Sequence, residues 1–233
     1  MIAGEGYKAI LFDLDDTLVD FKTAESKSLQ LTYEEFYQDL TPETDFRDLF
    51  HTINKSLWKS AEAGNLDTKH IRTLRFEEVN KAFPSKSSPE TIAQFYLDKL
   101  AETSEWIEGA EKAIQALSKS HKLGIITNGF SCVQRKKYTL HCMHNWIPLL
   151  VISEEVGCAK PDKRIFHWAL EKMGCTPDEV LMVGDSLSSD FEGAMASGID
   201  FCWINPQKHS LPPSLKEPKF KVQSVLAILE SAH

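Results

Sequence analysis

The sequence has no excess of basic residues and no long apolar run. Its 233 residues include 26 lysines and arginines against 34 aspartates and glutamates, which gives a formal net charge of −8. Such a chain lacks the basic surface that holds DNA or RNA, and it is equally unsuited to anionic lipid. No stretch approaches the ~18 consecutive apolar residues of a membrane-spanning helix. We therefore expect neither a nucleic-acid polymer nor a membrane as a partner.

Paired cysteines and a secretion signal are also missing. The five cysteines are far apart and none forms a CxxC pair, so their spacing predicts neither a disulfide framework nor a zinc ribbon. We expect them to be buried thiols. The first 16 residues lack the basic start and the long apolar stretch of a signal peptide. These absences favour a reducing, cytoplasmic location.

Five short apolar runs predict the core of the fold. They are Ala9–Phe12, Leu123–Ile126, Leu149–Ile152, Val180–Val183 and Phe201–Ile204. The runs are nearly continuous rather than alternating, which is typical of parallel strands buried on both faces by helices. Helical patterns separate the last four runs, and a final helix is predicted over residues 222–229. The sequence therefore predicts an α/β fold with a parallel sheet flanked by helices.

More than a hundred residues separate the first predicted strand from the second, and they carry helical patterns only. Apolar residues recur with helical spacing within 29–40, 46–57, 71–79 and 92–100. The composition of residues 84–89, Pro-Ser-Lys-Ser-Ser-Pro, predicts a loop. We interpret residues 21–103 as an all-helical insertion. Residues 1–20 and 104–233 then form one α/β core.

Polar residues follow four of the predicted strands. They are Asp13 after the first, Thr127 and Asn128 after the second, Lys160 shortly after the third, and Asp185 and Asp190 after the fourth. Ligands of open α/β sheets bind outside the carboxyl ends of the strands, so we expect these side chains to converge. Crowded carboxylates need a cation, and oxygen ligands favour Mg²⁺. Lys160 and Thr127 would then hold an anion.

Each of these residues has an ordinary structural explanation when it is taken alone. An aspartate after a strand commonly caps a helix or starts a turn. The acidic run that begins at Asp13 could be an EF-hand calcium loop, but Leu18 and Ala24 stand where that loop requires glycine and glutamate. Four strand ends, in order and with matching chemistry, favour a functional site over four separate caps.

In these residues the chain resembles the haloacid dehalogenase-like hydrolases. Their four signature motifs correspond to FDLDDT at 12–17, IITNG ending at Gly129, Lys160 in GCAKPDKRIF, and GDSLSSD at 184–190. The resemblance implies a Rossmann-like core and makes the insertion similar to the helical cap of this family. Residues 15–21, 126–137, 151–166 and 181–205 are similar to the pyrimidine 5′-nucleotidase branch, which dephosphorylates nucleoside monophosphates.

The resemblance implies a Mg²⁺-dependent phosphomonoester hydrolase that works through an aspartyl-phosphate. Asp13 would be the nucleophile, and Asp15 would be the general acid and base. Thr127 and Asn128 would bind the substrate phosphate together with Lys160, which would also offset negative charge.

The same resemblance implies the ligands of the metal. The side chains of Asp13 and Asp185 and the backbone carbonyl of Asp15 would hold Mg²⁺. Asp190 would orient a metal-bound water or Lys160 as an outer partner. Asp16 is expected to cap or hydrogen-bond the loop.

The implied cap would close over the site and contact the leaving group. Phe21, at the start of the insertion, is a candidate contact for a base or sugar of the substrate. Trp58, Arg72 and Arg75 are further candidates, with packing or surface roles as equal alternatives.

Two other functions remain open at this point. One is a small-metabolite phosphatase of the same family, acting on a sugar phosphate or phosphoglycolate. The other is a phosphoacceptor signalling domain, which also surrounds Mg²⁺ with acids, a threonine and a lysine. Signalling receivers lack a cap, and Asp15 beside Asp13 favours hydrolysis. We expect a small phosphate ester as the substrate and a monomer or small homo-oligomer as the assembly.

Overall fold

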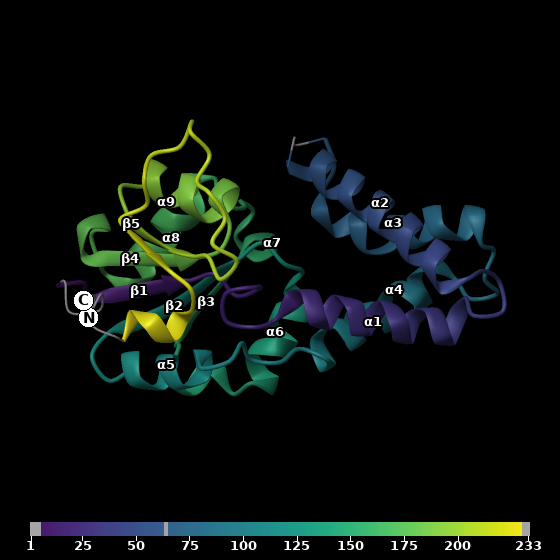
Figure 1. The fold of residues 1–233 in the computed structure, drawn as a ribbon, viewed down its shortest axis with the longest axis horizontal. Coiled ribbons are helices and arrows are strands. Elements are labelled where there is room, and N and C mark those ends of the chain that lie inside the picture. The colour runs from purple at the N-terminus through teal and green to yellow at the C-terminus, as the bar shows by residue number, and fades with distance from the viewer. Residues whose placement is uncertain (1–5, 63–64, 230–233) are drawn as a thin grey trace. The chain divides into compact units, whose positions relative to one another are not determined.

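A computed structural model describes residues 6–62 and 65–229 of the chain (Figure 1). The chain forms two compact units, of which the first comprises residues 1–21 and 105–233 and the second residues 22–104. The predicted absence of a signal peptide concerns the first 16 residues, and residues 1–5 of these lie outside the described residues. Residues 230–233 of the predicted core lie outside them as well. Among the described residues, no helix combines the length and apolar character that crossing a membrane requires.

The first unit is built on a parallel sheet, which has six strands within the described residues. The strands are β1 (Ala9–Phe12), β2 (Lys122–Thr127), β3 (Leu149–Ile152), β4 (Val180–Gly184), β5 (Asp200–Ile204) and β6 (Phe220–Val222). Their order is β3-β2-β1-β4-β5-β6, so the chain runs outward in opposite directions from β1. In open α/β sheets, ligands bind at the carboxyl ends of the strands beside such a reversal. The predicted parallel α/β fold is confirmed.

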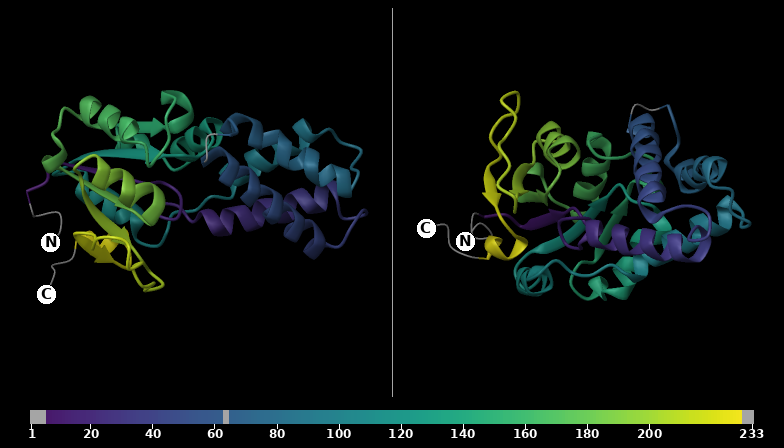
Figure 2. Two further views of the ribbon diagram at one scale, coloured as in Figure 1. Left: turned by 90° about the horizontal axis from the view of Figure 1, so that it is seen from above. Right: turned by 45° about the vertical axis from the view of Figure 1, so that its right-hand side comes forward.

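Helices cover both faces of this sheet, as Figure 1 shows and Figure 2 repeats from two further directions. On one face, Ile10 and Phe12 pack in a cluster with α5 (Ala110–Leu117). On the other face, Ala9 and Leu11 pack with α8 (Lys163–Met173). Because side chains alternate along a strand, burial on both faces explains the continuous apolar runs in the sequence.

Shorter elements complete the first unit. They are α6 (Ser131–Leu140), η2 (Met143–Asn145), α7 (Ser153–Val156), η3 (Pro177–Glu179), the π-helix η4 (Leu187–Phe191), α9 (Glu192–Ala196) and η5 (Val225–Ile228).

The C-terminal segment differs from its prediction. The helix expected over residues 222–229 is replaced by β6 and the short 3₁₀ helix η5. Phe220 of β6 pairs with Cys202 of β5, so the segment adds a sixth strand to the sheet. A strand of three residues is too short for its period to distinguish it from a helix, and the apolar residues of η5 extend the apparent helical pattern.

The second unit is helical and has its own aromatic core. Its helices are α1 (Phe21–Phe36), which begins at the last residue of the first unit, α2 (Glu43–Glu62), α3 (Thr68–Ala82) and α4 (Pro89–Glu102). The core is formed by Tyr37, Phe46, Phe50, Phe76 and Tyr96. The predicted loop ends one residue early, because Ser88 caps α4 by accepting a hydrogen bond from Thr91 N and Pro89 opens the helix.

The cysteines are free thiols, but most of them are not buried. Cys202 lies inside the sheet on β5, as expected for a buried thiol. Cys132 and Cys142 are exposed, so the expectation of burial is wrong for them. Cys132 lies on the outer side of α6, and Cys142 follows that helix in a left-handed turn with φ of 49°.

Candidate active site

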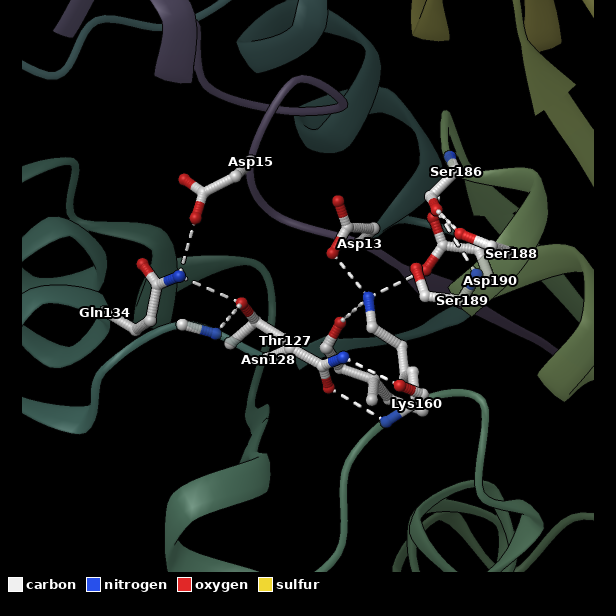
Figure 3. A network of polar contacts seen from close by, with 12 residues as sticks. Asp13, Asp15, Thr127, Asn128, Gln134, Lys160, Ser186, Ser188, Ser189 and Asp190 are labelled. Atoms are coloured by element: carbon white, nitrogen blue, oxygen red, sulfur yellow. Dashed lines mark hydrogen bonds and ion pairs between the residues drawn. The ribbon is translucent and has the colours of Figure 1, made fainter. Parts of the chain in front are cut away.

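The carboxyl ends of the central strands bring predicted polar residues together, and Figure 3 shows Asp13, Asp15, Thr127, Asn128, Lys160 and Asp190 among them. Asp13 follows β1, and its backbone N–H donates to the carbonyl of Val183 on β4 at 2.9 Å. The ammonium of Lys160 lies 2.5 Å from Asp13 Oδ1, 2.7 Å from Asp190 Oδ1 and 2.9 Å from the carbonyl oxygen of Ile126. The contacts with Asp13 and the Ile126 carbonyl are hydrogen bonds, and the contact with Asp190 is an ion pair.

Burial and charge act against each other at this ion pair. Burial raises the pKa of Asp13 well above its usual value, the Lys160 ammonium lowers it, and the carboxylates of Asp190 and Asp185 raise it further. Burial lowers the pKa of Lys160, but attraction by Asp13 and Asp190 outweighs burial and raises that pKa overall. Lys160 is therefore charged, and it faces more negative charge than it can neutralise.

Three carboxylates form a group that fits a divalent cation. One oxygen each of Asp13, Asp185 and Asp190 lie within 4.8 Å of one another. One ammonium stands beside these three carboxyl groups, and their hard oxygen donors are those that Mg²⁺ prefers. The indole Nε1 of Trp203 donates to the carbonyl of Asp185 at 2.9 Å and holds this loop against β5. Asp190, which is expected to be an outer partner of the metal, contributes an oxygen to this group and also lies 2.7 Å from Lys160 Nζ.

Two glycines of the motifs leave room for this arrangement. A Cβ atom on Gly184 would lie 2.2 Å from Asp190 Oδ2, and a Cβ atom on Gly129 would lie 1.9 Å from Gln134 Nε2. Both distances are far below any allowed contact. Glycine is therefore required here for close approach of polar side chains to the backbone.

The side chain of Asn128 contacts the backbone of Lys160. Its Nδ2 donates to the Lys160 carbonyl and its Oδ1 accepts from the Lys160 N–H, both at 2.8 Å. The loop with Lys160 is thereby tied to the end of β2, directly before a cis peptide bond to Pro161. The amide oxygen and one of the two Nδ2 donors of Asn128 are thereby engaged in holding this loop.

Asp15 lies on the same loop as Asp13 but has different partners. Its Oδ1 lies 2.6 Å from Lys137 Nζ, and its Oδ2 accepts from Gln134 Nε2 at 2.7 Å. The same Gln134 nitrogen donates to Thr127 Oγ1 at 2.9 Å, so the acid and the threonine are connected (Figure 3).

Gln134 and Lys137 are residues of the candidate site that no sequence motif predicts. Their spacing of three residues places them on one face of a helix, and this spacing is the one sequence feature that could have indicated a shared role. The surrounding sequence of α6, Ser-Cys-Val-Gln-Arg-Lys-Lys-Tyr-Thr-Leu, is polar and is more typical of a solvated helix. Burial of a lysine and a glutamine is visible only in the folded chain.

The residues at the start of the insertion have structural contacts. Asp16 adopts a left-handed conformation with φ of 59°, and its Oδ1 accepts from Phe21 N at 3.2 Å. This is the loop hydrogen bond that was expected of Asp16. The ring centroid of Phe21 lies 5.4 Å from Lys137 Nζ, within the range of a cation–π contact.

The other substrate candidates lie in the helical unit. Arg75 is buried, and its guanidinium carbon lies 4.4 Å from the ring centroid of Tyr96 and 5.4 Å from that of Phe76. Packing, the alternative that the sequence left open, accounts for Arg75. Trp58 on α2 and Arg72 on α3 are half-buried.

Comparison with known proteins extends these similarities to the whole chain. Residues 10–204 match the model of the haloacid dehalogenase-like hydrolases. The chain is 35% identical over 218 residues to the pyrimidine 5′-nucleotidase YjjG of Escherichia coli, and the match covers 93% of each protein. It is 30% identical over 227 residues to the pyrimidine 5′-nucleotidase PynA of Streptococcus pneumoniae, covering 96% of this chain and 94% of PynA.

A solved structure gives the same result at the level of the fold. The crystal structure of YfnB from Bacillus subtilis, which is bound to magnesium, superposes with a TM-score of 0.82 at 30% identity. That match covers 95% of this chain and 96% of YfnB. The four polar strand ends, the strand order around β1 and similarity along nearly the whole chain lead to one conclusion. The chain belongs to the haloacid dehalogenase-like hydrolase family.

Proposed function

We propose that this protein is a Mg²⁺-dependent phosphomonoester hydrolase that acts on pyrimidine nucleoside monophosphates. The observation that carries the hydrolase is the pair of carboxylates, Asp13 and Asp15, held on one loop beside Lys160 and Thr127. Cleavage of a carbon–halogen bond releases halide, which needs no proton. An acid placed beside the nucleophile instead suits a leaving alkoxide. The nucleotide class is supported by the identity to YjjG and PynA.

The proposed reaction has two displacements at phosphorus. A carboxylate oxygen of Asp13 attacks the phosphorus, the ester P–O bond breaks, and the leaving oxygen takes a proton from Asp15. Asp15 then removes a proton from a water molecule, which attacks the phosphorus of the aspartyl-phosphate. The Asp13 carboxylate is restored, and inorganic phosphate is released.

The remaining residues position and stabilise charge, which is most of what phosphoryl transfer requires. We assign to Lys160 an electrostatic role beside Asp13, because its buried ammonium donates to Asp13 and to the Ile126 carbonyl and forms an ion pair with Asp190. Thr127 and the backbone N–H of Asn128 would bind phosphate oxygens. The side chains of Asp13 and Asp185 and the carbonyl of Asp15 would hold Mg²⁺, with Asp190 orienting Lys160. The bound cation would neutralise charge that develops on the phosphate.

The helical unit of residues 22–104 is proposed to be the cap of this enzyme. In this family role it would exclude water and contact the leaving group. The protein would be cytoplasmic, and its partner would be a small phosphate ester rather than a nucleic-acid polymer.

A hydrolysis panel tests the proposed function. Phosphate release would be measured from UMP, dUMP, dTMP, AMP, GMP, sugar phosphates and phosphoglycolate, with Mg²⁺ present and with the Asp13→Asn variant as the blank. We expect the highest kcat/KM for the pyrimidine nucleotides. A preference for a sugar phosphate or phosphoglycolate would reject the nucleotidase but retain the phosphatase. A stable phosphoprotein without turnover would favour a signalling domain.

A further inference from the structure

Helix α6 carries two buried polar side chains to which the proposed reaction gives no role. Gln134 is 1% exposed and Lys137 is fully buried. They share the buried face of the helix with Val133. Such positions on the inner face of a helix are normally apolar, and lysine is rarely buried unless it is paired.

Both side chains are directed to Asp15. Lys137 Nζ contacts Oδ1 at 2.6 Å, and Gln134 Nε2 contacts Oδ2 at 2.7 Å. Each carboxylate oxygen therefore receives one donor from α6. Two donors on two oxygens determine both the position and the rotation of the carboxyl group, which a single contact would not do.

Gln134 also connects Asp15 to the place where phosphate is expected. Its Nε2 donates to Thr127 Oγ1 at 2.9 Å, and the absence of a side chain on Gly129 makes room for it. The dashed lines in Figure 3 follow this path from Asp15 through Gln134 to Thr127. The amide group of Gln134 thus fixes the position of the Asp15 carboxylate relative to the Thr127 hydroxyl.

Stability does not explain these two residues. Taking an ammonium out of water costs free energy that a buried ion pair only partly returns, and an apolar pair of similar volume often serves folding better. Gln134 Oε1 has no hydrogen-bond partner among the described residues, which is a further cost. The Phe21 ring lies beside the Lys137 ammonium, so an apolar group stands where water would otherwise hydrate the charge.

We propose that Lys137 and Gln134 are positioning residues that hold Asp15 for proton transfer to the leaving oxygen and from water. The inference rests on the proposed phosphatase, but it does not depend on which phosphate ester is the substrate. Misplacement of a reacting group by about 1 Å can reduce a rate by about 100-fold. Loss of either donor should therefore lower kcat and leave KM nearly unchanged.

The test uses two variants of the full-length enzyme and one matched control. Lys137→Met removes the ammonium and keeps the length of the chain, and Gln134→Met removes the amide without changing the charge. Arg135→Met is the control, because Arg135 lies on the same helix but is exposed and pairs with Glu155. Thermal unfolding and Mg²⁺ affinity would be measured for all three.

Two substrates with different leaving groups separate positioning from general damage. With UMP, whose leaving alkoxide needs a proton, we expect kcat to fall by about 10- to 100-fold in both variants. With p-nitrophenyl phosphate, whose leaving group needs none, we expect a rapid burst of p-nitrophenolate followed by slow turnover, because water activation is still impaired. Arg135→Met should match the wild type with both substrates.

The proposal is overturned if folded Lys137→Met and Gln134→Met keep the wild-type kcat for UMP. It is equally overturned if the p-nitrophenolate burst slows as much as UMP turnover, since the defect would then lie in Asp13 or phosphate binding. If Lys137→Met does not fold, Gln134→Met decides alone. Should the wild type prefer another alkyl phosphate over UMP, that ester replaces UMP, so failure of the nucleotidase assignment remains a separate result.

Discussion

On the scale of single residues, Lys160 has to balance more negative charge than one ammonium carries. Its ammonium donates to Asp13 and to the carbonyl of Ile126 and forms an ion pair with Asp190. A buried charge is tolerated when its hydrogen bonds are satisfied, so Lys160 is well placed to hold two carboxylates at one strand edge. It is less suited to donate to a substrate, which is why we assign it an electrostatic role.

The backbone beside these carboxylates has no spare room at Gly184. The change Gly184→Ala would place a Cβ atom 2.2 Å from Asp190 Oδ2 and would push this carboxylate away from Lys160. We expect a loss of stability of about 2–4 kcal/mol, because a buried ion pair is broken, and a large loss of Mg²⁺-dependent activity. Urea denaturation and phosphate release check this. A stable, fully active Gly184→Ala enzyme would contradict the geometry around Asp190.

On the scale of elements, the sequence predicts the parts of the fold that have a strong pattern. Strands β1 to β5 follow from their apolar runs, because strands buried on both faces need apolar residues throughout. Strand β6 has only three residues, and apolar residues continue into η5. The spacing of the apolar residues therefore could not distinguish this strand from a helix. Helix α6 has a polar sequence, and the burial of Gln134 and Lys137 depends on Asp15, which is 119 and 122 residues away in the chain. Contacts of that kind have no local signal.

A tie between two elements can be tested at Asn128. Asn128→Ala removes both 2.8 Å hydrogen bonds between the end of β2 and the Lys160 backbone. We expect a loss of about 1–3 kcal/mol in unfolding free energy, because two backbone groups lose their partner, together with a lower kcat. Asn128→Asp keeps the acceptor for Lys160 N–H but loses the donor, so its loss should be intermediate. Equal stability of all three proteins in urea would show that the tie contributes nothing.

On the scale of the whole molecule, a chain with a net charge of −8 brings three of its carboxylates together at one place. The reversal of strand order at β1 brings loops from distant parts of the chain to one sheet edge. There, three carboxylates lie close together, and two of them, Asp13 and Asp190, pair with the buried ammonium of Lys160. A divalent cation bound at this edge would offset the local negative charge, so that an acidic protein could hold an anionic ester there.

The folded protein should therefore gain stability from Mg²⁺. A cation that binds the native state alone adds about 2.7 kcal/mol at a concentration of 100 times its Kd. We expect Mg²⁺ to raise the melting temperature and EDTA to abolish phosphate release reversibly. In the variant Asp185→Asn, the Mg²⁺-dependent rise should be greatly reduced. Full activity in EDTA would remove the metal from the proposed reaction.

The most direct test of the proposed reaction is to trap the phosphorylated enzyme. The enzyme would be mixed with UMP and Mg²⁺, quenched in acid within milliseconds and treated with sodium borohydride, which reduces an acyl-phosphate to the alcohol. Peptide mass spectrometry would then locate the modified residue. We predict homoserine at position 13 and none in the Asp13→Asn variant. Turnover of the substrate with Asp13 unmodified, or with the label on another residue, would contradict the assignment of Asp13 as the nucleophile.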